Sequence, residues 1–161
     1  MRVVSLVPSI TETLLAWGIT PAACTRFCEQ PSLTHVGGTK DPDLRAIEAL
    51  APDLVVVDRE ENRLEDHDEL VAAGLRVHVT AVRRLDQLDD EMDRLAGAVG
   101  AEWQPLGLPP PPPPTRSAFV PIWRRPWMAL GHPTYGSTVL EALGVANAAS
   151  GRGPYTEMEL D

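Results

Sequence analysis

The sequence predicts an α/β protein, with a Rossmann-like lobe that has a parallel sheet and helices on both faces, followed by an incomplete second α/β lobe. Short runs of apolar, β-branched residues alternate with helical segments in the first hundred residues, a pattern typical of parallel α/β sheets. The run Leu54–Val57 is uniformly apolar, as expected for a strand that helices cover on both faces. A run of prolines, Pro109–Pro114, then interrupts the pattern.

These changes in residue composition and pattern predict the domain organisation. We expect an N-terminal α/β lobe at residues 1–100, a proline-rich linker at residues 101–117 and a partial C-terminal lobe at residues 118–161. The six prolines exclude a helix and predict a semi-rigid polyproline II spacer of roughly 19 Å. A docking site for an SH3-like partner is the alternative interpretation of this run.

The chain opens with a strand followed directly by a helix. The run Arg2–Val7 is short and β-branched and is bounded by Pro8, which predicts a buried strand. Ser9 is the expected N-cap of the helix, with Glu12 as its capping-box partner, and Gly18 ends the segment.

The rest of the first lobe continues the alternation. Asp41 is the expected cap of a short helix, Leu44–Leu50. Pro52 and Asp53 end the helical segment and precede the strand Leu54–Val57. The remaining expected elements are a strand within Ala22–Phe27, an acidic helix at Arg59–Ala73, a strand at Arg76–Thr80 and an amphipathic helix at Leu85–Val99.

The segment beyond the prolines predicts one further strand–helix unit. Phe119–Leu130 reads as a strand, a kinked turn and a second apolar run, Ser137–Leu143 as a short helix, and another helix is expected to begin after Tyr155. One such unit has no partner layer on which to bury its faces. Either it docks on the first lobe, or the rest of a second lobe is missing.

Composition excludes several classes of function. The net charge of −9 argues against nucleic acid as a partner, and no apolar run reaches the about 18 residues of a membrane span. The opening MRVVSLVPS lacks a secretory signal. The chain is therefore expected to be cytoplasmic as written, or periplasmic or at the cell surface if an export signal was removed. No GxSxG, HExxH or GxGxxG motif occurs, so we expect no enzyme activity.

The two cysteines, Cys24 and Cys28, do not predict a metal site or a disulfide. Two thiols cannot form a structural zinc site by themselves. Residues four apart on a strand lie about 13 Å apart, which is too far for a disulfide. We expect plain core or loop thiols.

Loops that follow the strands of a parallel sheet share the edge at which ligands bind. This rule predicts a ligand site in the first lobe that contains Pro8, Ser9, Gly37, Gly38, Thr39, Glu60 and Glu61. Ser9 offers a hydroxyl or a helix N-terminus, besides its role as a cap. Gly37 and Gly38 allow close approach of a ligand, or only permit a turn. Glu60 and Glu61 could receive a cation or a basic partner, or belong to a solvated acidic face.

A second group of candidates lies beyond the prolines. Trp123 and Trp127 flank Arg124, and Tyr135 follows nearby. Aromatic faces and guanidinium groups suit large, flat, anionic or amide-bearing ligands, although both tryptophans could instead pack a hinge. The four histidines form no HxH or HxxxH pair, so metal coordination stays open, with His35 and His132 as weak candidates.

Five segments together resemble one family. They are RVVSLVPSITETLLAWG, VGGTKDPDLRAIEALAPDLVVV, DREENRLED, PIWRRPWMALGHPTYGSTVLEALGVANA and PYTEMELD. In this order they resemble the class III periplasmic substrate-binding proteins of the cobalamin and ferric-siderophore receptor type, including variants described as helical-backbone metal receptors. Two features depart from the family: LGLPPPPPP stands where its members have one long helix, and the second lobe is expected to be shortened.

The resemblance implies a non-catalytic function. The ligand would be a metal-containing cofactor or chelate, cobalamin-like or a ferric siderophore or heme, with no further cofactor required. The protein would serve an ABC-type uptake system, and acidic surface residues would dock on a permease. The alternative is a shortened, signal-less lobe that acts as an intracellular ligand sensor or a protein-interaction module, with self-association through the incomplete second lobe.

Overall fold

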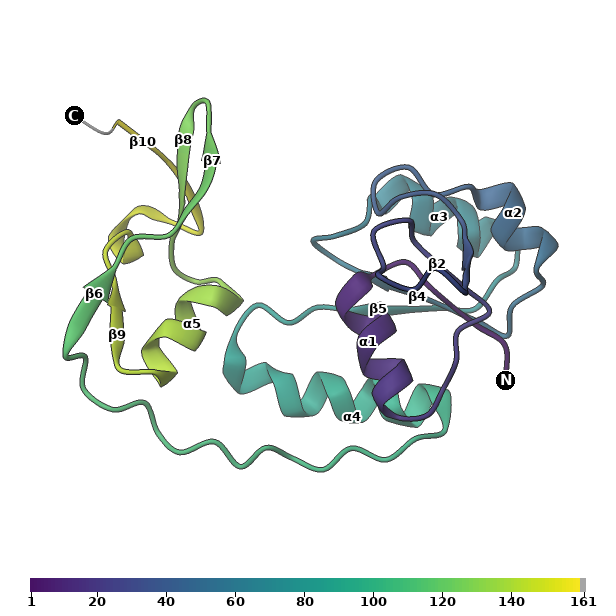
Figure 1. Cartoon of the computed structure of the whole chain (residues 1–161), viewed down its shortest axis with the longest axis horizontal. Coiled ribbons are helices and arrows are strands. Elements are labelled where there is room, and N and C mark those ends of the chain that lie inside the picture. The colour runs from purple at the N-terminus through teal and green to yellow at the C-terminus, as the bar shows by residue number, and fades with distance from the viewer. Residues whose placement is uncertain (160–161) are drawn as a thin grey trace. The chain divides into compact units, whose positions relative to one another are not determined.

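The computed structural model describes residues 1–159. The chain divides into two compact units (Figure 1). The first unit comprises Met1–Ala81 and Asp93–Glu102, and the second comprises Val82–Met92 and the chain from Trp103 onward. We describe each unit by itself.

The first unit is built on a five-stranded sheet. Its strands are β1 (Val3–Ser5), β2 (Ala23–Cys24), β3 (Thr34–His35), β4 (Leu54–Asp58) and β5 (Val77–Thr80). They lie in the order β3-β2-β1-β4-β5, and every neighbouring pair is parallel. The predicted α/β class with a parallel sheet is therefore confirmed.

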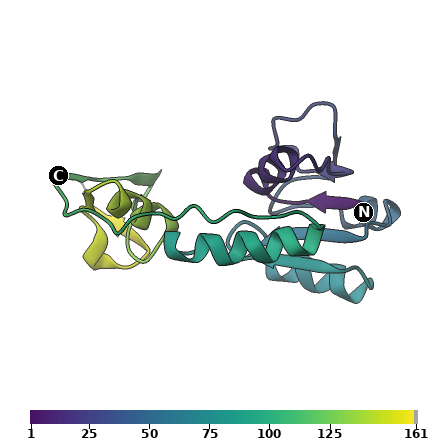
Figure 2. The ribbon, with the colours of Figure 1, turned by 90° about the horizontal axis from the view of Figure 1, so that it is seen from below.

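Helices cover both faces of this sheet. They are α1 (Pro8–Ala16), α2 (Leu44–Ala49), α3 (Leu64–Ala72) and the second half of α4 (Leu88–Val99), which follows a short 3₁₀ turn, η1 (Leu85–Gln87). The chain leaves β1 toward β2 and later crosses back toward β4 and β5. Because such crossovers are right-handed, α1 lies on one face and α3 on the other (Figure 1), and Figure 2 shows the unit from the side of α1 and α4.

The core of the first unit follows the alternation of side chains along the strands. Val4, Val55 and Val57 face the α2–α3 side, where they pack with Ile47 of α2 and Leu70 of α3. Each such buried side chain contributes about 1.5–3 kcal/mol through the hydrophobic effect. The whole of Leu54–Val57 is buried, which confirms the prediction drawn from its uniformly apolar run.

Two predicted helix caps are wrong. Helix α1 begins at Pro8 with Val7 as its N-cap, so Ser9 lies inside the first turn and forms no capping box with Glu12. Proline is favoured at the first helical position because it lacks the N–H that would lose its partner there. For α2 the cap is Asp43, whose carboxylate accepts from Ala46 N at 3.0 Å, rather than Asp41.

Besides η1 and the first part of α4, the described part of the second unit contains helix α5 and two small sheets. Beyond the prolines its elements are β6 (Arg116–Ala118), β7 (Pro121–Arg124), β8 (Trp127–Leu130), α5 (Tyr135–Ala142), β9 (Val145–Asn147), a 3₁₀ turn η2 (Ser150–Arg152) and β10 (Tyr155–Met158). Strands β10, β8 and β7 form an antiparallel sheet in that order, and β6 pairs with β9 in parallel.

The helix expected after Tyr155 is wrong, because β10 occupies this segment. Tyr155 pairs with Leu130 of β8, and Met158 pairs with Trp127. Tyr and Thr at the start of the segment favour an extended strand, and the ladder with β8 satisfies its backbone groups. The last two residues of the expected helix, 160–161, lie outside the described residues.

The segment before β6 has no regular secondary structure. Residues 101–114 form neither helix nor strand, and Pro109–Pro114 are exposed. The exclusion of a helix from the proline run is therefore confirmed, whereas its use as a docking site remains a prediction.

Candidate functional site

The predicted candidates of the first unit meet at one edge of the sheet. Pro8 and Ser9 follow β1, Gly37–Thr39 follow β3, and Glu60 and Glu61 follow β4. Because these strands are parallel and β1 lies beside β4, the three loops share the carboxyl edge at the point where the strand order reverses. Ligands of open α/β sheets bind at such a reversal point, in the crevice outside the carboxyl ends of the strands.

Asn62, which the sequence interpretation missed, connects these loops. Its Nδ2 donates to Leu6 O at 3.1 Å and to Thr39 O at 2.9 Å, and its Oδ1 accepts from Asp58 N at 2.8 Å. The residue is only 8% exposed. One buried amide therefore holds together the loops after β1, β3 and β4. The sequence offered one indication of this role: an Asn stands four residues after the end of β4, the most clearly predicted strand.

Asp58 shapes the loop that carries the two predicted glutamates. Its Oδ1 accepts from the backbone N–H of Glu60 at 2.8 Å and of Glu61 at 3.2 Å, and its Oδ2 accepts from Thr80 Oγ1 at 2.8 Å. Lys40 Nζ donates to the carbonyl oxygen of Glu60 at 2.6 Å. Glu60 and Glu61 themselves are exposed, so their loop is fixed through its backbone while both side chains reach the surface.

Steric contacts in the turn after β3 bear on why glycine occurs at positions 37 and 38. Gly37 has a φ of +89°, and a Cβ on it would lie 2.5 Å from the carbonyl oxygen of Asp41. A Cβ on Gly38 would lie 2.3 Å from Asp41 Oδ1, which pairs with Arg26 Nη2 at 2.9 Å. The tight turn therefore requires Gly37, whereas a Cβ on Gly38 would meet only the ends of the exposed Asp41 and Arg26 side chains. A ligand contact with their backbone is a separate prediction.

The second unit presents its candidates on a hairpin. Strands β7 and β8 are joined across a cis Arg125–Pro126 bond. Arg124 pairs directly with Trp127, and its guanidinium carbon lies 5.8 Å from the centre of a Trp127 ring. This is a cation–π contact, and it places these two candidates on the same face of the hairpin.

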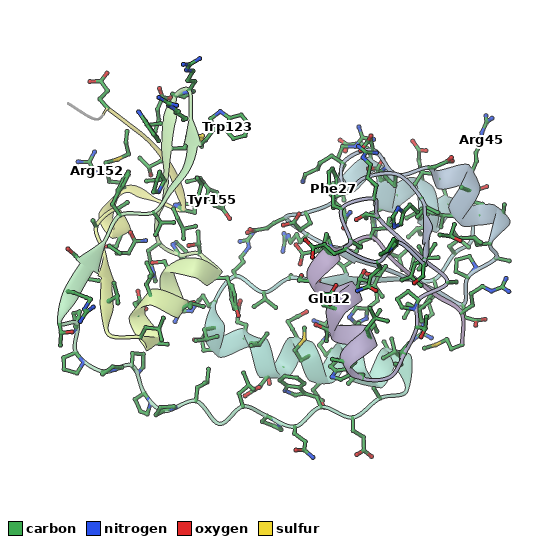
Figure 3. The ribbon with its side chains drawn as sticks, viewed as in Figure 1. Glu12, Phe27, Arg45, Trp123, Arg152 and Tyr155 are labelled. Atoms are coloured by element: carbon green, nitrogen blue, oxygen red, sulfur yellow. The ribbon has the colours of Figure 1, made fainter. Side chains whose placement is uncertain are left out.

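Trp123 lies on the opposite face. It pairs with Met128, so its side chain shares a face with Leu130 and with Tyr155, which pairs with Leu130 (Figure 3). Trp123 is 64% exposed, and its Nε1 donates to Arg125 O at 3.2 Å. The two tryptophans therefore do not flank Arg124 as one surface. Tyr155 was missed because a helix was expected there.

Tyr135 stands apart from the hairpin in the chain. It begins α5, follows a cis His132–Pro133 bond by two residues, and is exposed. Thr134 caps this helix by accepting from Ser137 N at 3.2 Å. The position of Tyr135 is therefore set by a capped helix rather than by the sheet.

The histidines do not assemble a metal centre among residues 1–159. His35 Nε2 lies 3.1 Å from Gln30 O, and His132 Nδ1 lies 3.3 Å from Glu141 Oε1. Within the described part of the chain, no three His, Cys, Asp or Glu side chains gather closely enough to hold an ion.

Both cysteines are buried, free thiols of the first unit, as expected for core thiols. Cys28 Sγ lies 3.4 Å from Thr11 Oγ1 and 3.4 Å from Thr25 Oγ1. Cys24 ends β2 whereas Cys28 lies beyond it, so the strand distance assumed from the sequence does not apply. Burial, with a contribution from nearby Cys28, raises the pKa of Cys24 to about 12.

Relatives of known function are similar to most of the chain in sequence. The vitamin B12-binding protein of Salmonella typhimurium is 31% identical over 108 residues, which is 65% of this chain and 39% of that protein. The vitamin B12-binding protein of Yersinia pestis is 32% identical over 101 residues, which is 59% of this chain and 36% of that protein. The chain thus matches less than half the length of these relatives. No protein-family model matches it.

Solved structures share the fold. The periplasmic vitamin B12-binding protein of Vibrio cholerae superposes with a TM-score of 0.77 at 19% identity and covers 99% of this chain and 70% of its own. The periplasmic heme-binding protein of Roseiflexus superposes with a TM-score of 0.78 at 22% identity, over 98% of this chain and 70% of its own.

The fold and the parallel-sheet edge define an α/β protein whose fold is shared with solved periplasmic binding proteins. The predicted resemblance to class III periplasmic binding proteins is confirmed, and the similar proteins are those named for vitamin B12 and for heme. Among the described residues, no helix is long and apolar enough to cross a bilayer.

Proposed function

We propose that this chain binds a metal-containing cofactor or chelate of the cobalamin or heme type and catalyses no reaction. The observation that carries the proposal is the 31% identity with a vitamin B12-binding protein over 108 residues. That length of alignment is more than an isolated strand–helix unit could supply. Binding would hold the ligand without forming or breaking a covalent bond.

The chemistry of the candidate residues supports a large ligand with both flat and polar parts. In the first unit, the edge offers a helix N-terminus at Pro8 and Ser9 and the backbone of Gly37–Thr39. Such groups hydrogen-bond polar substituents of a ligand. In the second unit, Trp123 and the Arg124–Trp127 pair offer faces on which a conjugated ring stacks.

A place in transport follows from the same similarity. We propose that the chain delivers its ligand to an ABC-type permease, with the exposed carboxylates of Glu60 and Glu61 as the docking charges. The matched solved structures are periplasmic by their names, and we propose a periplasmic or cell-surface location for the protein that contains this chain.

A second candidate function is a protein-interaction module. It is favoured by the exposure of Phe119 and Ile122, which are 36% and 43% accessible in the second unit. Exposed apolar side chains of this size favour association. Light scattering decides this: a concentration-dependent dimer that Ile122→Ser abolishes supports the module, and a monomer at all concentrations contradicts it.

Titration with candidate ligands tests the main proposal. Calorimetry and absorption spectroscopy with cobalamin, hemin and a panel of ferric siderophores should find at least one ligand with a Kd of about 10 μM or lower. Trp123→Ala should weaken that binding by about 10-fold or more. The control is Leu143→Ala, because Leu143 is 70% exposed at the end of α5 and is no ligand candidate. A Kd above about 1 mM for every ligand tested would falsify the proposal.

A further inference from the structure

A pocket of about 470 Å³ opens within the first unit beside the ends of β4 and β5. Val57 and Val79 supply apolar lining, and they are neighbours in the β4–β5 ladder. The remaining lining includes Arg59 after β4, Arg63 before α3 and Arg94 of α4. This volume lies within the range of small-molecule pockets, about 300–1,000 Å³.

The charge of the lining is opposite to that of the chain. Three arginines line the pocket although the whole chain carries a net charge of −9. Its only carboxylate is Asp58, and both oxygens of that group already accept hydrogen bonds from Glu60, Glu61 and Thr80. The pocket therefore has a local excess of positive charge beside an apolar surface.

The three arginines differ in their availability. Arg63 pairs through two nitrogens with buried Asp66, at 2.6 and 2.9 Å. Arg94 lines the pocket from α4. Within the part of the chain that the structure describes, the Arg59 guanidinium makes no ion pair or hydrogen bond, and the side chain is exposed. Arg59 is therefore the group that can receive an anion without breaking an existing contact.

Helix α3 contributes a histidine to the lining. His67 also lines the pocket, and its Nδ1 lies 2.8 Å from Asp68 Oδ1. Helix α3 carries the carboxylates of Glu65, Asp66, Asp68 and Glu69, and Glu65 and Asp66 both act on Arg63. Asp66 is committed to Arg63, and Asp68 is largely exposed to water. None of these carboxylates forms an ion pair with Arg59 in the described part of the chain.

We propose that this pocket binds a small molecule through an oxyanion group, either a carboxylate or a phosphate, anchored by Arg59. A guanidinium group donates two parallel hydrogen bonds to such a group. The surface at Val57 and Val79 covers an apolar part of the same molecule. The pocket shares Asp58, Arg59 and Asn62 with the loop after β4 of the candidate site, but the inference names a different ligand chemistry and requires no corrin or porphyrin.

The test uses pyrophosphate as the phosphate probe and citrate as the carboxylate probe, on the full chain at low salt. We expect saturable binding of one of them with a Kd below about 1 mM. Arg59→Gln should weaken it by about 10- to 100-fold, and Arg59→Lys should recover part of the loss. Arg45→Gln is the matched control, because Arg45 is an exposed arginine of α2 outside the pocket (Figure 3).

Each outcome decides between the alternatives. Loss of pyrophosphate binding in Arg59→Gln alone supports a phosphate ligand, and loss of citrate binding in that variant alone supports a carboxylate ligand. The proposal is overturned if neither probe saturates, or if Arg59→Gln and Arg45→Gln lose affinity equally. Because the probes contain no corrin or porphyrin, this result is independent of the cobalamin and hemin titrations.

Discussion

At the scale of single residues, Asn62 joins the loops of the candidate site. Its side chain joins Leu6, Thr39 and Asp58 through three hydrogen bonds while remaining buried. The sequence predicted which loops share the edge, because that follows from parallel strands. The sequence could not predict that one amide connects these loops, because the distances from Asn62 to Leu6 and to Thr39 are set only by tertiary packing.

Replacing this amide should destabilise the first unit. Asn62→Ala leaves two carbonyl oxygens and one N–H without their partner, and we expect a loss of about 2–4 kcal/mol in the free energy of unfolding. Urea denaturation followed by circular dichroism measures this loss. Gln104→Ala, at an exposed position in the second unit, is the control and should stay within about 0.5 kcal/mol of the parent chain. An equal loss in both variants would contradict the role of Asn62.

Cys24 makes stability depend on pH in the alkaline range. Its pKa rises from 9.0 to about 12 in the folded chain, so the folded state holds the thiol proton more tightly than the unfolded state. This contribution is fully present below about pH 8.5 and is lost as the pH rises toward 12.

The expected result concerns the difference between two chains. Between pH 9 and about 11, the parent chain should lose more stability than Cys24→Ala, because only the parent carries the shifted thiol. Urea midpoints measured at half-unit pH steps provide the comparison. Parallel pH profiles for the two proteins would show that burial of Cys24 does not shift its titration.

At the scale of elements, the strands and most helices follow from sequence patterns, whereas their ends do not. The strand β4 was predicted because a uniformly apolar run of this length has few alternatives. The cap of α1 was missed because Pro8 and Ser9 are both acceptable near a helix start, and the fixed φ of proline decides between them. Strand β10 was missed because its pairing with β8 is a contact between segments distant in sequence.

Two glycines in different loops can be compared: Gly37 lies between β3 and α2, and Gly74 lies between α3 and β5. Gly37 and Gly74 both have a positive φ, +89° and +80°, but a Cβ on Gly37 meets backbone atoms whereas a Cβ on Gly74 meets open space. Gly74→Ala should cost about 1–2 kcal/mol from backbone strain alone. Gly37→Ala should cost about 3 kcal/mol or more, because the turn must also shift. Equal losses in thermal or urea unfolding would show that the close approach to Asp41 does not constrain this turn.

At the scale of the whole molecule, the proposed function requires a different kind of ligand contact from each unit. The first unit provides a polar sheet edge built on backbone groups and a buried amide. The second unit provides aromatic side chains on an exposed hairpin. The sequence pattern and the family resemblance predicted both groups. The division of the hairpin into two faces depends on strand register, which no local pattern specifies.

The most direct measurement of the central claim is hydrogen–deuterium exchange of the full chain with and without the ligand that binds in the titrations. The account predicts slower exchange in the loops that follow β1, β3 and β4, at residues 8–10, 37–39 and 59–62, with α2 unchanged as the internal reference. Saturable binding without added protection in any of these loops would contradict it. Protection confined to the hairpin would do the same, because the sheet edge would then have no part in binding.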